Sequence, residues 1–388
     1  MQKLLIKSAK IPARGDDNNY NILIDNGKIA DIKLSKSLFF SEYQKNTKVL
    51  DAKGKNLVPG YIDLHIQGAG GADILDGTEE AINNVSKVCA KYGVTRFLAT
   101  TVYKVGENNQ HLEVASRLTE KKLNGARLEG IHLEGPFISI DKKGMIQPSS
   151  ITGPSFKVLD DIFRKSKGAL KMMTIAPELK NVEPIIKKLI NESVIASLGH
   201  TSATYEETLR GFELGINHVT HIYNAMMGIH HRAPGPLIAI YENKSIISQI
   251  ITDGVHISPP VLRFTSDTLG ADRLAIITDG MRPMDLPEGE YFYEGQKYIL
   301  KNGTALYTDG TLIGTAIGIG ELLDRYIKIT NRNFNDVLKM AIEVPAKVLG
   351  LEGYCIKLKE GMDADLLILG DGFIPEITIV NGNVVYKR

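Results

Sequence analysis

Residues 193–226, SVIASLGHTSATYEETLRGFELGINHVTHIYNAM, decide the fold. Two apolar, strand-like runs end on His200 and His221, and a segment with helical spacing separates them. A strand, a helix and a second strand in this order are typical of a parallel βαβ unit. One histidine after a strand is unremarkable, but a pair at successive strand ends indicates that the two side chains hold something together.

The same alternation extends in both directions from this stretch. Eight apolar runs are separated by segments with helical patterns, such as TEEAINNVSKVCAKYG (78–93) and ATYEETLRGFELG (203–215). The runs are YIDLHI (61–66), VTRFLATT (94–101), ARLEGIHLEG (126–135), ALKMMTIAP (169–177), SVIASLGH (193–200), INHVTHIY (216–223), SIISQIITDG (245–254) and RLAIITDG (273–280). Continuous runs rich in β-branched residues predict a parallel sheet covered on both faces.

Eight repeats of this unit predict an α/β fold of the (β/α)8, or TIM-type, barrel class. The alternative is an open, doubly wound sheet. Its dinucleotide-binding version requires a GxGxxG motif after the first strand, and this chain has none. We therefore favour the closed barrel.

The hydrophobic pattern at both ends of the chain differs from the pattern in the middle. Residues 1–58 contain short alternating runs with Asn-Gly and Lys-Gly turns, and residues 358–388 repeat that pattern. We expect the two ends to form one small β-sandwich domain. Residues 59–357 would then form the barrel domain.

Composition excludes several classes of protein. Among 388 residues, 46 Lys and Arg balance 45 Asp and Glu, so the net charge of +1 and the lack of a dense basic run argue against a nucleic-acid partner. Only two cysteines are present, Cys89 and Cys355, which fits a reducing compartment. The start MQKLLIKSAK has too short an apolar stretch for a signal peptide, and no run approaches the ~20 apolar residues of a membrane span. We expect a cytoplasmic protein without a membrane partner.

Polar and ionisable residues stand at the carboxyl ends of six of the predicted strands. In strand order they are His65 and Gln67, Glu134, His200, His221, His256 and Asp279. In a (β/α)8 barrel the carboxyl ends of all strands meet at one rim, where active sites lie. Residues far apart in the sequence should therefore be neighbours.

The chemistry of this set indicates a metal site. Glu134, His200 and His221 supply a carboxylate and two imidazoles, a ligand set suited to one Zn²⁺ or Fe²⁺ ion with a position left open for water. A bound ion lowers the pKa of that water towards ~7, which makes hydroxide available at neutral pH. Asp279 would take the proton during attack and return it to the leaving group. This chemistry predicts hydrolysis, most naturally of an amide.

Each of these residues also has a purely structural interpretation. A histidine at a strand end is most often a hydrogen-bonded structural residue. Glu134 before Gly-Pro can close a turn, and Asp279 before Gly280 can cap a helix or a turn. Four such groups at the ends of four different strands favour the functional interpretation.

The motifs around these positions resemble the N-acetylglucosamine-6-phosphate deacetylase family, a branch of the amidohydrolase superfamily. They are PGYIDLHIQGAGG, GIHLEGPF, TIAPE, SLGHTSAT, THIYNAM, HHRAPG, ITDGVH and ITDG, in an order and spacing that cover nearly the whole chain. HLEGP with THxxNAM is specific to this branch, whereas PGxIDxH indicates only the superfamily. The resemblance implies a barrel with a small β-sandwich from both termini, and hydrolysis of N-acetylglucosamine 6-phosphate to glucosamine 6-phosphate and acetate.

The resemblance also implies roles for individual residues. It makes Glu134, His200 and His221 the metal ligands, Asp279 the acid/base, and His256 the donor that polarises the N-acetyl carbonyl. Arg232 in HHRAPG matches a phosphate-binding arginine that reaches a neighbouring subunit in relatives, which implies a homodimer. The remaining substrate contacts that it implies are Met145, Asn224, Ala225, Asp253, Gly254, Val255, Leu312, Ile313 and Gly314.

The first strand departs from part of the family. Members with two metals have His-x-His at this position, and this chain has His65-Ile66-Gln67. Because a carboxamide replaces one imidazole, we expect one tightly held ion. His65 and Gln67 would form at most a weak second site, or would hydrogen-bond water or sugar.

Three rival functions stay open at this point. The first is the same reaction on the galactosamine epimer, which no motif distinguishes. The second is another amidohydrolase acting on a cyclic amide or a dipeptide; many of these use a carboxylated lysine on the fourth strand, and ALKMMTIAPE has no lysine near its carboxyl end. The third is a barrel without activity that serves as a scaffold, which predicts the loss of site residues that are all present.

Overall fold

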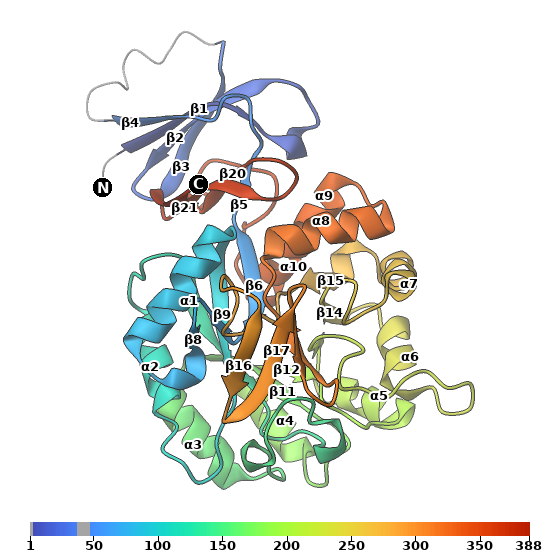
Figure 1. The fold of residues 1–388 in the computed structure, drawn as a ribbon. Coiled ribbons are helices and arrows are strands. Elements are labelled where there is room, and N and C mark those ends of the chain that lie inside the picture. Colours follow the sequence, from blue (N-terminus) through green and yellow to red (C-terminus); the bar gives the residue numbers. More distant parts are fainter. Residues whose placement is uncertain (1–2, 37–46) are drawn as a thin grey trace.

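The computed structural model describes residues 3–36 and 47–388, and its central element is the predicted parallel sheet (Figure 1). All eight predicted strands are present, and neighbours in the sequence are neighbours in the sheet. They are β6 (Tyr61–Ile66), β9 (Val94–Thr101), β10 (Arg127–Glu134), β11 (Leu170–Ile175), β12 (Ile195–Leu198), β13 (His218–Val219), β14 (Ile247–Ile250) and β15 (Leu274–Ile276). Every pairing between them is parallel. The prediction of a (β/α)8 barrel is confirmed.

The barrel closes at the carboxyl ends of its first and last strands. Ile66 forms a parallel bridge with Gly280, which follows β15. The amide of Asp279 donates to the carbonyl of His65 at 3.0 Å, and the amide of Gln67 donates to the carbonyl of Gly280 at 2.9 Å. Closure therefore brings the polar end of the first strand against the polar end of the eighth.

Helices connect the strands and cover the outside of the barrel. They are α1 (Glu79–Lys91), α2 (Gln110–Thr119), α3 (Phe156–Ser166), α4 (Glu183–Asn191), α5 (Tyr205–Glu213), α6 (Gly235–Glu242), α7 (Pro259–Leu269), α8 (Ile319–Thr330), α9 (Phe334–Ala341) and α10 (Glu343–Val348). The predicted helix in the opening stretch is α5, which begins with a capping box between Thr204 and Glu207. Within residues 3–36 and 47–388, no helix has both the length and the hydropathy to cross a membrane.

Two further sheets contain both ends of the described chain. One has the order β3-β2-β1-β4 and the other β22-β21-β20-β5. Their strands are β1 (Lys3–Lys10), β2 (Asn19–Asp25), β3 (Lys28–Leu34), β4 (Thr47–Asp51), β5 (Leu57–Pro59), β20 (Leu366–Leu369), β21 (Pro375–Val380) and β22 (Asn383–Lys387). Side chains of both sheets share one apolar core, which includes Ile6, Ile22, Leu366 and Ile379.

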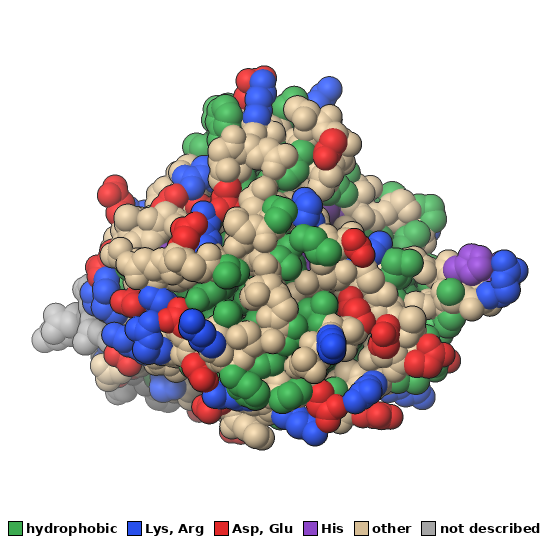
Figure 2. Space-filling view, turned by 90° about the horizontal axis from the view of Figure 1, so that it is seen from below, with side chains coloured by type: hydrophobic (Ala, Val, Ile, Leu, Met, Phe, Trp, Pro, Cys, Tyr) green, Lys and Arg blue, Asp and Glu red, His purple; other side chains and the backbone are tan. Residues whose placement is uncertain are grey.

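This shared core supports the division that we propose, with residues 1–58 and 358–388 as a small domain and 59–357 as the barrel domain. Residues 1, 2 and 37–46 of the proposed small domain lie outside the described residues. Figure 2 shows the molecule from the end opposite this small domain, where hydrophobic, acidic and basic side chains are interspersed.

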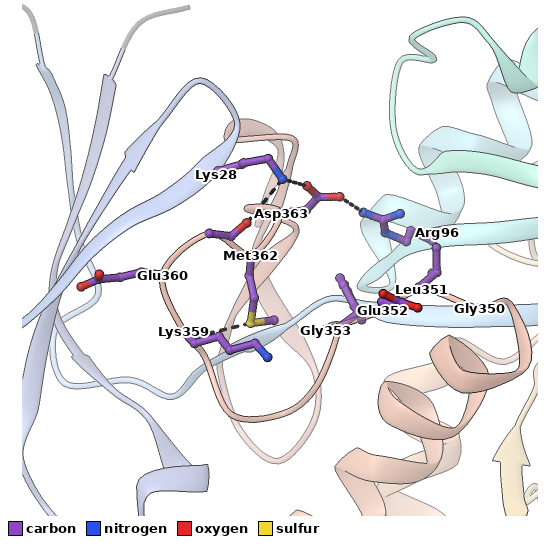
Figure 3. A pocket seen from close by; sticks show the side chains of 12 residues that line it. Lys28, Arg96, Gly350, Leu351, Glu352, Gly353, Lys359, Glu360, Met362 and Asp363 are labelled. Carbon is purple, nitrogen blue, oxygen red and sulfur yellow. Dashed lines mark hydrogen bonds and ion pairs between the residues drawn. The ribbon is translucent and has the colours of Figure 1, made fainter.

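A charged cleft of about 520 Å³ lies where the small domain meets the barrel (Figure 3). Arg96 of β9 pairs through one nitrogen with Asp363 and with Asp365 at 2.7 Å, and through the other with Glu129 at 2.8 Å. Lys28 of β3 holds the other oxygen of Asp363 at 3.0 Å. These ion pairs connect the barrel to both parts of the small domain.

A third antiparallel sheet follows β15 and was not predicted. It consists of β16 (Gly289–Tyr293), β17 (Gln296–Lys301), β18 (Thr304–Tyr307) and β19 (Leu312–Thr315). Its inner face packs around Tyr298 and Ile313 against Met145 and Met281 of the barrel rim. Glu-Gly, Asn-Gly and Asp-Gly turns between its short strands were the available signal. A two-stranded ribbon, β7 (Gly68–Ala69) with β8 (Ala72–Asp73), lies between β6 and α1.

Candidate active site

Glu134, His200 and His221 converge at the carboxyl ends of β10, β12 and β13. His200 Nε2 and His221 Nε2 each lie 2.9 Å from Glu134 Oε1, and the two nitrogens lie 3.1 Å apart. All three side chains are buried. These three residues are neighbours, as the sequence predicted. Their donor atoms form a group that can hold a metal ion.

The backbone at these positions is unusual. His200 has φ of 48°, His221 of 29° and Asp279 of 48°, all in the left-handed region that residues other than glycine rarely adopt. Such conformations cost free energy and are concentrated at functional sites. At three strand ends the chain therefore keeps an unfavourable backbone conformation on the residue whose side chain faces the barrel rim.

The hydrogen bond on the far side of His200 fixes its tautomer. Nδ1 lies 2.7 Å from the carbonyl oxygen of Lys142, which can only accept, so Nδ1 carries the proton. In the neutral ring Nε2 then presents a lone pair to the Glu134 carboxylate at 2.9 Å. Two acceptors at that distance repel each other unless a cation lies between them. The donor set therefore fits a divalent ion, and the carbonyl of Lys142 orients His200 as outer groups of metal sites orient a ligand.

The pKa shifts of Glu134 and His221 agree with a metal site. Burial alone would raise the pKa of Glu134, but His65 and the close contacts with His200 and His221 outweigh burial and hold that pKa well below its ordinary value. Burial lowers the pKa of His221. A carboxylate and neutral imidazoles are the protonation states in which these side chains bind metals.

His65 and Gln67 lie beside the cluster and contact it differently. Gln67 donates from Nε2 to Glu134 Oε2 at 3.0 Å, so its amide nitrogen holds that carboxylate in place. His65 Nε2 lies 3.3 Å from Asp279 Oδ1 and 3.6 Å from Glu134 Oε2. Burial favours the neutral form of His65, but these two carboxylates outweigh it and raise its pKa to about 9.

A cavity of about 270 Å³ opens in front of the cluster. Most of the residues predicted to form the site line it: Gln67, Glu134, Met145, His200, His221, Asn224, Ala225, His256, Asp279, Leu312 and Ile313. The predicted residues outside that lining are His65, Arg232, Asp253, Gly254, Val255 and Gly314. The cavity also contains Asp141, Lys142, Gly144 and Thr311, which sequence reasoning missed. The KKG sequence before Met145 was the only available signal for two of these, Lys142 and Gly144.

Asp253 holds His256 rather than facing the cavity. Asp253 Oδ1 accepts from the amides of Val255 and His256, both at 2.9 Å, and Oδ2 lies 2.7 Å from His256 Nδ1. Burial would raise the pKa of Asp253, but its hydrogen bond with His256 lowers it. With Nδ1 bound to this carboxylate, the buried Nε2 is the nitrogen of His256 that remains for a ligand.

Arg232 does not line the cavity of its own chain. It belongs to the segment that precedes α6, and this segment extends away from the barrel (Figure 1). The segment is exposed and includes apolar side chains, Met227 and Ile229, with 43% and 51% of their surface accessible. Arg232 contacts its neighbour His231 at 2.7 Å. Basic and histidine side chains accordingly project at one edge of the molecule in Figure 2.

Comparison with known proteins agrees with the fold and the site. Residues 56–385 match the model of the amidohydrolase family. The N-acetylglucosamine-6-phosphate deacetylase of Bacillus subtilis (strain 168) is 33% identical over 99% of this chain and 98% of its own length. An N-acetylgalactosamine-6-phosphate deacetylase of Escherichia coli O157:H7 is 28% identical over 84% of this chain and 86% of its own length.

A solved structure gives the same result in three dimensions. The crystal structure of N-acetylglucosamine-6-phosphate deacetylase from Pasteurella multocida superposes with a TM-score of 0.88 and 26% identity. The superposition covers 98% of this chain and 99% of that one. The similarity therefore includes the barrel, the small sheets and the third sheet as one arrangement.

Proposed function

Because this chain belongs to the amidohydrolase family, we propose that it hydrolyses the N-acetyl amide of N-acetylglucosamine 6-phosphate to glucosamine 6-phosphate and acetate. The observation that carries this proposal is the convergence of His200 Nε2 and His221 Nε2 on Glu134 Oε1 in front of a cavity. The names of full-length relatives supply the substrate class.

Glu134, His200 and His221 would hold one divalent ion per subunit, either Zn²⁺ or Fe²⁺, since both accept this ligand set. When bound, such an ion supplies a Lewis acid and lowers the pKa of water. The contact from Gln67 Nε2 to Glu134 Oε2 supports a single ion, because an amide nitrogen that donates a hydrogen bond is not a ligand. A weak second site at His65 would lack that partner.

Asp279 would act as the acid/base. It lines the cavity at the end of the eighth strand, where its backbone amide donates a hydrogen bond to the carbonyl of His65. Its carboxylate would accept a proton from the attacking water and donate it to the departing nitrogen. The second transfer is required because an amine anion is too poor a leaving group.

The remaining residues would bind and orient the substrate. His256 would direct Nε2 at the N-acetyl carbonyl, where negative charge develops, while Asp253 holds its other nitrogen. Asn224, Ala225, Met145 and the segment from Leu312 to Gly314 would contact the sugar, and the segment from Asp253 to Val255 would support them.

Arg232 would bind the phosphate of a substrate in a neighbouring subunit, so the active form would be a homodimer in the cytoplasm. The exposed segment that contains Arg232, with apolar Met227 and Ile229 beside it, supports an intermolecular role. Within its own chain this arginine does not line the cavity.

Acetate release from purified, metal-analysed protein tests the proposal. N-acetylglucosamine 6-phosphate, N-acetylgalactosamine 6-phosphate and unphosphorylated N-acetylglucosamine should be compared by kcat/KM. We expect the glucosamine phosphate to be the best substrate. A higher kcat/KM for the galactosamine epimer would favour the second candidate function, which the Escherichia coli relative supports. No release from either phosphate by fully loaded protein would reject both.

A further inference from the structure

Lys142 is the one lysine or arginine among the described residues that line the active-site cavity. The carboxylates of Asp141 and Asp279 line the same cavity, in addition to the carboxylate of the metal-ligand cluster. A phosphorylated sugar brings further negative charge into this space, which is unfavourable unless a cation lies close to the phosphate. Because Arg232 does not line the cavity of its own chain, Lys142 is the lysine or arginine that the same subunit provides there.

The backbone of Lys142 is anchored to a metal ligand. Lys142 ends a short 3-10 helix, and its amide donates to the carbonyl of Ser139 at 3.1 Å. Its own carbonyl accepts from His200 Nδ1 at 2.7 Å, and the amide of Ser139 donates to the carbonyl of His200 at 2.9 Å. The side chain of Lys142 therefore starts from a point that is fixed relative to the metal site.

The ammonium group of Lys142 is available for a ligand. Within residues 3–36 and 47–388, no hydrogen bond or ion pair to a protein group engages its Nζ, and the residue is partly exposed. The adjacent Lys143 differs, because its Nζ donates to the carbonyl of Gly144 at 3.3 Å and it does not line the cavity. The two neighbouring lysines thus form a matched pair, of which only Lys142 is among the residues that line the cavity.

We propose that Lys142 binds the 6-phosphate of the substrate from within the same subunit and selects phosphorylated sugars over unphosphorylated ones. This inference rests on the proposed function and deepens it. A flexible ammonium group can follow the phosphate as a point charge, so Lys142 contributes to binding in the ground state and the transition state alike. Its loss should therefore raise KM more than it lowers kcat.

The test combines a change in the protein with a change in the ligand. Binding of glucosamine 6-phosphate and of glucosamine is measured by calorimetry to the metal-loaded full-length protein and to the Lys142→Ala, Lys142→Arg and Lys143→Ala variants. We expect Lys142→Ala to weaken binding of glucosamine 6-phosphate about ten- to hundredfold, the usual range for a lost hydrogen bond to a charged group. Binding of glucosamine should change less than twofold. Lys142→Arg should restore most of the affinity, and Lys143→Ala should bind like the wild type.

Equal affinity of Lys142→Ala and wild type for glucosamine 6-phosphate would overturn the inference, and so would an equal loss in Lys143→Ala. Metal content is measured on each variant, because the carbonyl of Lys142 supports His200 and must still do so after the substitution. Acetate release from N-acetylglucosamine 6-phosphate, measured on the same preparations, separates the two proposals. Binding that depends on Lys142 without any acetate release would support the phosphate site and reject the proposed reaction.

Discussion

At the scale of single residues, Asp279 takes part both in closing the barrel and in lining the active-site cavity. Its amide closes the first and last strands, and its carboxylate lies 3.3 Å from His65 Nε2 and lines the cavity. Asp279→Asn keeps the shape of the side chain and removes the carboxylate that we propose as the proton acceptor. We expect kcat to fall about 10²- to 10⁴-fold, the usual contribution of general acid–base catalysis, with the metal content unchanged.

Steady-state acetate release with parallel elemental analysis measures this effect. Near-normal turnover of metal-loaded Asp279→Asn would show that another group carries the proton. A loss of metal together with activity would instead assign Asp279 a role in ligation.

The sequence predicted the residues of this site to different degrees. Glu134, His200 and His221 were predictable because strand ends in a closed barrel converge whatever the intervening loops do. Lys142 was not, because a lysine in a loop carries no periodic signal and its position depends on hydrogen bonds to His200. The role of Asp253 beside His256 likewise depends on local backbone geometry.

At the scale of elements, strand β19 packs directly against the backbone of Asp279. Gly314 in this strand has φ of 153°, and a Cβ placed there would lie 2.5 Å from the carbonyl oxygen of Asp279. We expect Gly314→Ala to displace Asp279 or β19 and to lower kcat/KM by at least tenfold. Gly289 provides the matched control, because it has the same φ and no atom within 4 Å of an added Cβ.

The kcat/KM values of the two variants separate two effects, the backbone strain of an alanine at this φ and the collision of its Cβ with Asp279. Gly289→Ala includes the backbone cost of an alanine at this φ but no collision. Similar kcat/KM values for Gly314→Ala and Gly289→Ala would contradict the proposed coupling between β19 and Asp279.

Helix α2 contains a buried histidine, His111, from which we predict a loss of stability in acid. Burial lowers the pKa of His111 to about 4, from an ordinary value of 6.5, while Nε2 lies 2.9 Å from the carbonyl of Val102. Between these values the unfolded chain binds the proton and the folded chain does not. The free energy of unfolding should therefore fall as the pH is lowered from about 6.5 to about 4.

His111→Gln keeps a donor for the carbonyl of Val102 and does not titrate. Urea denaturation of wild type and variant at pH 7 and pH 4.5 measures the difference. We expect the wild type to lose stability relative to the variant at the lower pH. A difference between the two proteins that stays constant with pH would exclude His111 as the cause.

The third sheet, β16 to β19, shows why elements were predicted unevenly. The eight barrel strands are long enough, or apolar enough, to give a clear pattern. Strands β16 and β17 alternate exposed and buried residues on the surface, and their pattern is short and mixed with charged residues. This sheet packs over Met145 and Met281 at the barrel rim. That packing depends on contacts between distant parts of the chain, which a local sequence pattern does not report.

At the scale of the whole molecule, Arg96 joins the two proposed domains (Figure 3). Only 3% of its side chain is exposed, and it pairs with Asp363, with the fully buried Asp365 and with Glu129. Arg96→Met removes the buried cation from Asp365 and leaves only the more exposed Arg127, at 3.5 Å, beside that buried carboxylate. We expect a loss of about 3–5 kcal/mol in the free energy of unfolding.

Arg127 is the matched control for this prediction. It approaches the same acidic residues, Asp363 at 3.3 Å and Asp365 at 3.5 Å, but 41% of its side chain is exposed. Arg127→Met should cost about 1 kcal/mol or less, because solvent screens exposed pairs. Equal losses for the two variants in urea denaturation would refute the assignment of Arg96 as the buried link.

The arrangement of the whole chain was predictable in outline and not in detail. Turn chemistry at both ends indicated small β-sheets, and eight repeats indicated the barrel. The ion pairs between Arg96 and Asp363 connect residues 267 positions apart, and no local pattern reports such a contact.

The central claim is that Glu134, His200 and His221 hold one metal ion that the hydrolysis requires. The most direct test removes metal with a chelator, returns Zn²⁺ or Fe²⁺ in known amounts, and measures acetate release from N-acetylglucosamine 6-phosphate together with metal content. We predict that activity disappears with the metal and returns in proportion to added ion until one ion is bound per chain. Activity that survives complete metal removal, or that needs two ions per chain, would contradict the account.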